Sequence, residues 1–177
     1  QLDEDSFQSR EALGLLYADE NNYDQAILEI RKAIDLKADE PRLHLTLGKL
    51  LLEADREQEA TETFKEAAGL FPEDFSVQIK VADWYFVKGM LSESLENYKA
   101  AEVIDPNNSI IQSKLGQIFL DKNNGKKARN AFERAIKLNP NDSESHYQLG
   151  KLVSVEKKWD RAQSLLSNAV SLDVTHA

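Results

Sequence analysis

The side chains that could do chemistry in this chain of 177 residues are carboxylates, lysines, arginines and three histidines. A metal site needs several ligands close together, but His44, His146 and His176 are scattered along the sequence and no cysteine is present. No glycine-rich loop of the kind that binds phosphate occurs, and the glutamates of residues 57–62 have the pattern of a solvated helix face. The sequence therefore predicts a protein that is not an enzyme and that holds no cofactor or metal ion.

Positive charge is densest after residue 125, in an otherwise acidic chain of net charge −9. This basic stretch consists of Lys126, Lys127, Arg129, Arg134 and Lys137. It has three interpretations: a solvated helix face, weak self-association with the acidic N-terminal part, or contact with nucleic acid or anionic lipid. The net negative charge argues against nucleic-acid binding as the main activity, because that binding depends on neutralising phosphates.

Small and bulky residues recur every 34 positions and define the elements that position these side chains. The first small column is Gly14, Gly48, Ala82, Gly116 and Gly150, and two more are Ala26, Ala60, Ser94, Ala128, Ala162 and Ala33, Ala67, Ala101, Ala135, Ala169. Between them runs a bulky column of Ile30, Phe64, Tyr98, Phe132 and Leu166. Apolar residues follow helical spacing on both sides of a turn in each period, which predicts helical hairpins.

Turn and capping residues mark where these helices end. We expect turns at Asn21-Asn22, at residues 53–56, at Gly89 and at residues 123–125. Second helices should end near Pro72, Pro106 and Pro140, and Asn108 and Asp142 offer side-chain oxygens to cap the helices that follow.

These columns resemble the tetratricopeptide repeat, which has a leucine-glycine pair, an aromatic residue three positions on, then alanine, a bulky residue, alanine and a closing proline. The usual tryptophan is replaced by Arg10, His44, Gln78, Gln112 and His146. The resemblance implies an all-α fold, an α-solenoid of antiparallel hairpins forming a right-handed superhelix with a concave groove. It also implies an extension of residues 1–6 and a single array over 7–176, with repeats 7–40, 41–74, 75–108, 109–142 and 143–176.

In this family the first helix of each hairpin lines the groove, where a peptide or helix of a partner binds. Carried onto this chain, the candidate groove residues are Leu45, Lys49, Leu52, Ile79, Lys80, Asp83, Phe86, Val87, Ile110, Lys114, Gln117, Leu120, Tyr147 and Lys151. The apolar members are not required by the core columns, so we expect an exposed apolar patch, and four lysines add positive charge. A partner with acidic and hydrophobic character would fit. The alternative is that the apolar residues pack between first helices and the lysines are simply solvated.

Two specialised forms of the family do not match. Members that dock the C-terminal tails of Hsp70 or Hsp90 use Lys, Asn and Arg donors on three successive first helices, whereas the corresponding positions here include Glu11, Leu15 and Asp83. Sugar-transferring members carry an asparagine ladder, but the ladder position here includes Ala12 and Thr46. We therefore expect neither activity.

The sequence as a whole predicts a scaffold for protein–protein interaction within a multiprotein assembly. The alternatives are a regulatory or substrate-recruiting array of a larger enzyme, or a self-assembling structural protein. No run of about 18 apolar residues predicts membrane insertion, and this soluble pattern suits the cytoplasm and the periplasm equally. The edge of the last repeat, around Val153, Leu165 and Leu172, is expected to lie partly open, to be covered by further repeats of a longer parent protein or by a partner.

Overall fold

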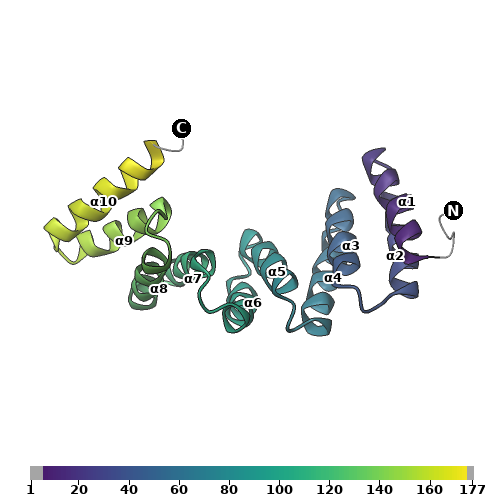
Figure 1. Ribbon diagram of the computed structural model, residues 1–177, viewed down its shortest axis with the longest axis horizontal. Coiled ribbons are helices and arrows are strands. Elements are labelled where there is room, and N and C mark those ends of the chain that lie inside the picture. Colours follow the sequence, from purple (N-terminus) through teal and green to yellow (C-terminus); the bar gives the residue numbers. More distant parts are fainter. Residues whose placement is uncertain (1–5, 175–177) are drawn as a thin grey trace. The chain divides into compact units, whose positions relative to one another are not determined.

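The computed structural model describes residues 6–174, and these form ten α-helices and no strand (Figure 1). The helices are α1 (Phe7–Asp19), α2 (Tyr23–Leu36), α3 (Pro41–Glu53), α4 (Glu57–Leu70), α5 (Phe75–Val87), α6 (Leu91–Ile104), α7 (Ser109–Asp121), α8 (Gly125–Leu138), α9 (Ser143–Val155) and α10 (Trp159–Val174). Apart from Ser6, the predicted extension of residues 1–6 lies outside the described residues, as do His176 and the end of the fifth repeat.

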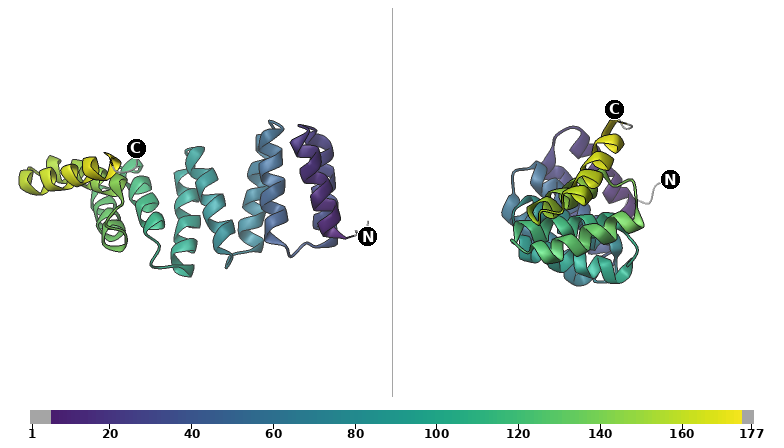
Figure 2. Two further views of the ribbon diagram at one scale, coloured as in Figure 1. Left: turned by 45° about the horizontal axis from the view of Figure 1, so that its top comes forward. Right: turned by 90° about the vertical axis from the view of Figure 1, so that its left-hand side faces the viewer.

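The chain divides into two compact units, one ending at Val81 and the other beginning at Ala82, so that α5 contributes to both. In the first unit α1 packs against α2, α2 against α3, and α3 against α4. In the second unit each of the helices from α6 to α10 packs against the next one, and Figure 2 shows α9 and α10 side by side. The predicted all-α architecture of helical hairpins is confirmed.

Each hairpin reverses at one residue in the left-handed backbone conformation, and these residues recur every 34 positions. They are Asn21, Asp55, Gly89, Asn123 and Lys157, with φ between 55° and 70°. The amide that follows each of them donates to the carbonyl five positions back, as Asn124 N does to Phe119 O at 2.7 Å. This arrangement closes the preceding helix by satisfying one of its last carbonyls. The turn at Lys157 was not predicted, because lysine has no turn preference.

Side-chain oxygens cap α7 and α9 as the sequence predicted. Asn108 Oδ1 accepts from the Ile111 amide at 3.3 Å, and Asp142 Oδ1 accepts from the Ser145 amide at 3.1 Å. Each cap satisfies one of the amides that a helix leaves free at its N-terminus. The caps therefore fix where α7 and α9 begin.

The glycine column lies directly against the bulky column of the second helix. A β-carbon at Gly48 would lie 2.5 Å from Phe64 Cε1, and one at Gly116 would lie 2.6 Å from Phe132 Cε1. Both phenylalanines are buried, so these contacts leave no room for a side chain at the glycine. The small column thus sets how closely the two helices of a hairpin approach.

The third repeat departs from the small-residue columns at two positions that contact each other. Ala82 replaces the glycine and Ser94 replaces an alanine, and both are fully buried. The Ser94 hydroxyl donates to the Ala82 carbonyl oxygen at 2.9 Å. The buried hydroxyl is therefore satisfied within the hairpin.

Candidate partner-binding surface

In the first unit the candidate residues lie on α3 and on the first part of α5. Lys49 and Lys80 are exposed, and Leu52 and Ile79 are half-buried. Lys49 Nζ lies 3.4 Å from the Glu53 carboxylate one turn later on the same helix. The lysines of this unit are therefore accessible to solvent, while its apolar candidates are partly covered.

Leu45 is the one candidate whose side chain is buried, with 8% of its surface exposed. The prediction that Leu45 forms part of an exposed apolar patch is wrong. The equivalent position one repeat earlier is Glu11, which is also buried, and Arg42 of α3 donates to its carboxylate at 2.9 Å. This position of a first helix therefore faces the next first helix, which explains why Leu45 is covered.

Three candidate residues on the first helices of the second unit expose apolar side chains. Val87 at the end of α5 is 77% exposed, Ile110 at the start of α7 is 65% exposed, and Tyr147 on α9 is 44% exposed. Val87 and Ile110 belong to the apolar positions that the sequence predicted to be exposed, whereas Phe86 and Leu120 of the same set are half-buried.

Two of the candidate lysines in the same unit lie over aromatic rings. Lys114 Nζ is 5.6 Å from the centroid of the Phe86 ring, and Lys151 Nζ is 5.0 Å from the centroid of the Tyr147 ring. These distances allow cation–π attraction, which holds the ammonium groups beside apolar surface. The surface therefore combines positive charge with hydrophobic area.

The other candidates of the second unit already have partners within the chain. The Asp83 carboxylate accepts a hydrogen bond from the Tyr98 hydroxyl, and Gln117 Nε2 donates to Asp121 at 3.1 Å. Leu120 is half-buried against a core cluster of Ala128, Phe132, Leu149, Val153 and Ala162. These contacts position the three side chains, and Leu120 contributes mainly to the core.

A cavity of about 430 Å³ opens beside Ile110 and Lys114. Ser109 and Ser113 of α7 complete one wall, and residues of the α8–α9 connection and the start of α9, between 139 and 144, form the other. The Ser145 hydroxyl donates to Ser113 Oγ at 3.1 Å, which ties α9 to α7 next to this cavity. The helices that carry the exposed candidates are thus held together directly.

The column that lacks the usual tryptophan forms hydrogen bonds between repeats that were not predicted from the sequence. His44, Gln78, Gln112 and His146 are all buried. Each reaches back to the preceding second helix or its end, as His146 Nε2 does to the Pro140 carbonyl oxygen at 3.0 Å and Gln112 Nε2 to Glu102 at 2.8 Å. These side chains join one repeat to the next, and the 34-residue spacing of polar residues was the available signal.

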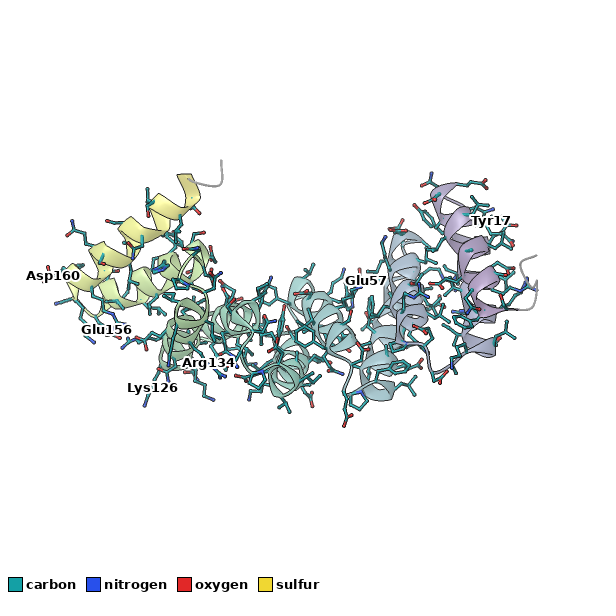
Figure 3. The ribbon with its side chains drawn as sticks, in the orientation of Figure 1. Tyr17, Glu57, Lys126, Arg134, Glu156 and Asp160 are labelled. Atoms are coloured by element: carbon teal, nitrogen blue, oxygen red, sulfur yellow. The ribbon has the colours of Figure 1, made fainter. Side chains whose placement is uncertain are left out.

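The basic stretch does not form one continuous surface. Arg129 pairs with Glu156, and Arg134 Nη1 lies 2.8 Å from the Glu102 carboxylate. Lys126 is exposed, and Figure 3 shows it pointing away from α8, whereas Arg134 lies on the side toward α6. The stretch therefore divides between helix contacts and solvent.

An apolar cavity of about 930 Å³ lies on the last hairpin, lined by residues of α10 and by Ser154 of α9. Trp159 and Val170, two of its lining residues, are 64% and 65% exposed. The prediction that Val153 lies at an open edge is wrong, because that side chain is fully buried. Leu165 and Leu172 are half-buried, as expected for a partly open edge, and Trp159 and Val170 of α10 are more exposed.

Within residues 6–174 no three His, Asp or Glu side chains gather in a way that could hold a metal ion. None of the described helices is both long enough and apolar enough to cross a membrane.

Family models match most of the chain at the hairpins described above. A model described as TPR repeat matches residues 82–123 and 116–154, and one described as tetratricopeptide repeat matches residues 11–75. The chain belongs to the tetratricopeptide repeat family. Proteins with this repeat are in general non-catalytic scaffolds that bind proteins or peptides. A comparison with curated protein sequences found no match to the chain.

Solved structures of other tetratricopeptide repeat proteins share the fold at low sequence identity. MamA is 17% identical, covering 92% of this chain and 95% of its own, with a TM-score of 0.78. YrrB is 14% identical, covering 98% and 90%, with a TM-score of 0.76. PilF from Pseudomonas aeruginosa is 19% identical, covering 93% and 75%, with a TM-score of 0.73. These matches establish an α-solenoid fold.

Proposed function

We propose that this chain is an interaction module that holds an extended peptide or a helix of another protein on the face of its first helices, as part of a larger assembly. The proposal includes a single array over residues 7–176, with candidate residues in both units. The general role of tetratricopeptide repeats supports it. So does the structure of YrrB, described as a TPR protein with an unusual peptide-binding site.

The observation that carries the proposal is the combination of apolar surface and lysines in the second unit. Val87 and Ile110 expose most of their side chains, and Lys114 and Lys151 present ammonium groups beside aromatic rings. Exposed apolar side chains that gather on one surface commonly mark contact sites. A segment with apolar residues flanked by Asp or Glu would bury the former and pair the latter with lysine.

The experiment begins with selection of peptides from a random library on immobilised protein of residues 1–177. Calorimetry then measures the affinity of one selected peptide for the wild-type protein and for variants. We expect Ile110→Ser and Lys114→Glu each to weaken binding about tenfold, because they remove a central apolar contact and reverse a charge.

Matched controls come from second helices. Val103 on α6 is 81% exposed and Lys126 on α8 is also exposed, so Val103→Ser and Lys126→Glu make the same chemical changes elsewhere. These two variants should keep wild-type affinity. Peptides that bind the Ile110→Ser and Lys114→Glu proteins as tightly as the wild type would refute the proposal.

A further inference from the structure

Neighbouring second helices are bridged by arginine–carboxylate pairs at one fixed position of the repeat. Arg31 of α2 lies 3.0 Å from Glu59 of α4 in the first unit. Arg161 of α10 lies 2.6 Å from Glu133 of α8 in the second unit. In both pairs the partners are 28 residues apart, and the positions of one pair are related to those of the other by three repeats of 34 residues. The contact between second helices therefore accommodates a carboxylate beside a cation.

The same two positions between α6 and α8 both hold lysine. Lys99 corresponds to Arg31 and Glu133, and Lys127 corresponds to Glu59 and Arg161. Lys99 and Lys127 line one cavity of about 220 Å³, which we call the Lys99–Lys127 cavity. Here neither helix supplies the carboxylate that the two other contacts contain.

The only carboxylate that lines this cavity, Glu102, is already engaged. Its Oε1 accepts from Arg134 Nη1 at 2.8 Å and from Gln112 Nε2 at 2.8 Å. Arg134 is held further by a bond from Nη2 to the Pro106 carbonyl oxygen at 2.6 Å. Glu102 thus balances Arg134, and the charges of Lys99 and Lys127 remain without a compensating anion in the cavity.

The walls of the cavity suit one small anionic group. Leu115, Phe119 and Ala131 provide apolar surface, and Asn130 adds an amide. Lys127 Nζ lies 5.6 Å from the centroid of the Phe119 ring, which holds this ammonium group at the wall. Both lysines are exposed, and the apolar floor excludes water from one side of an anion placed between them.

We propose that the Lys99–Lys127 cavity receives the carboxylate of a glutamate or aspartate from an acidic segment of a partner protein. The two equivalent contacts show that a carboxylate fits between neighbouring second helices at this register. The cavity is lined by residues of α6, α7 and α8, and none of them belongs to the proposed peptide-binding surface. It is therefore a second interaction site, independent of the first.

The test uses a fluorescein-labelled hexaglutamate peptide as the probe and fluorescence anisotropy at low salt as the measurement. Lys127→Glu supplies the missing carboxylate from within the chain, so Lys99 gains an internal partner. We expect this variant to lose about tenfold in affinity for the probe. Its melting temperature should rise by about 1–3 °C relative to the control below.

Lys126→Glu is the matched control. It makes the same change of charge one residue away, in the same first turn of α8, but Lys126 does not line the cavity. Both variants therefore gain equally from an acidic residue near a helix N-terminus, and the difference between them reports the cavity. Lys126→Glu should change the affinity by less than about twofold. Adding Lys99→Gln to Lys127→Glu should cancel the extra thermal stability, because the new glutamate loses its partner.

Three results would overturn the proposal. The first is equal loss of affinity in the Lys126→Glu and Lys127→Glu proteins, which would mean diffuse attraction. The second is absence of hexaglutamate binding to the wild-type protein while inorganic phosphate binds, which would assign the cavity to tetrahedral oxyanions. The third is extra stability of Lys127→Glu that persists with Lys99→Gln. Failure of the peptide-binding proposal would leave these measurements unchanged, because they involve neither Ile110 nor Lys114.

Discussion

The Tyr98 hydroxyl donates a hydrogen bond to the Asp83 carboxylate and so joins α6 to the last part of α5 within the second unit. Tyr98 is 1% exposed and occupies the bulky column, where the other repeats carry Ile30, Phe64, Phe132 and Leu166. Only in this repeat does the column carry a polar group. Asp83, a candidate binding residue, is therefore oriented by a side chain of the core.

Tyr98 should make the stability of the protein depend on alkaline pH. Burial, together with the hydrogen bond to Asp83, raises the pKa of Tyr98. Its contribution to stability is therefore fully present below about pH 10, the pKa of an unfolded tyrosine, and is lost as the pH rises further. Tyr98→Phe should lower the free energy of unfolding at pH 7 by about 1–2 kcal/mol and make the decline above pH 10 shallower. Urea unfolding at several pH values measures both effects, and an unchanged alkaline decline would contradict the prediction.

Gly116→Ala should destabilise the protein by about 1–3 kcal/mol, because the new β-carbon would overlap the buried ring of Phe132. Gly69 offers a control within a helix, since no atom lies within 4 Å of a β-carbon placed there. Gly69→Ala should stabilise α4 by up to about 0.5–1 kcal/mol. Urea unfolding distinguishes the two, and shifts of the same sign would count against the close helix contact at Gly116.

His146→Gln should be tolerated, because glutamine occupies the equivalent position as Gln78 and donates to the Phe71 carbonyl oxygen at 3.2 Å. His146→Leu removes the group that contacts the Pro140 carbonyl oxygen and should cost about 1–2 kcal/mol. Thermal melts of the two variants test this. Equal loss of stability in both would show that histidine acts by shape and not by hydrogen bonding.

Leu45 and Ile110 should respond differently to the same change. Leu45→Ser introduces a hydroxyl into a buried apolar site and should destabilise the protein by about 2–4 kcal/mol. Ile110→Ser alters an exposed residue and should change stability by less than about 0.5 kcal/mol. Circular dichroism during urea titration gives both values. A large effect of Ile110→Ser would mean that this side chain belongs to the core.

The 34-residue columns predicted the hairpins and most of their turns, because small residues, bulky residues and caps act within one repeat. Exposure of the candidate binding residues was harder to predict, because it depends on the side chain that the next repeat places against them. Glu11 is buried and Arg42 donates to it 31 residues later, and Leu45 occupies the corresponding position. The type of residue at one position does not show whether the next repeat will bury it.

The basic stretch was difficult for a different reason. Neighbouring residues of a helix point in directions about 100° apart, so charges that are consecutive in sequence do not share a surface. Arg129 therefore pairs with Glu156, and Lys127 lines the Lys99–Lys127 cavity, whereas the neighbouring Lys126 does not. The register relative to the other repeats, and not the local density of lysine, separates these roles.

The ion pairs between second helices run in opposite directions along the chain. Arginine comes first in Arg31–Glu59, whereas the carboxylate comes first in Glu133–Arg161. A duplication or deletion that placed α10 next to α2 would set Arg161 opposite Arg31. Each pair contributes only about 0.2–1 kcal/mol to the free energy of unfolding. Because the rearranged chain would have repulsion in place of attraction, its loss of stability would be roughly twice that amount. The hairpins have the same backbone structure and yet are not interchangeable, because charges of opposite sign meet between α2 and α4 and between α8 and α10 only in the native order.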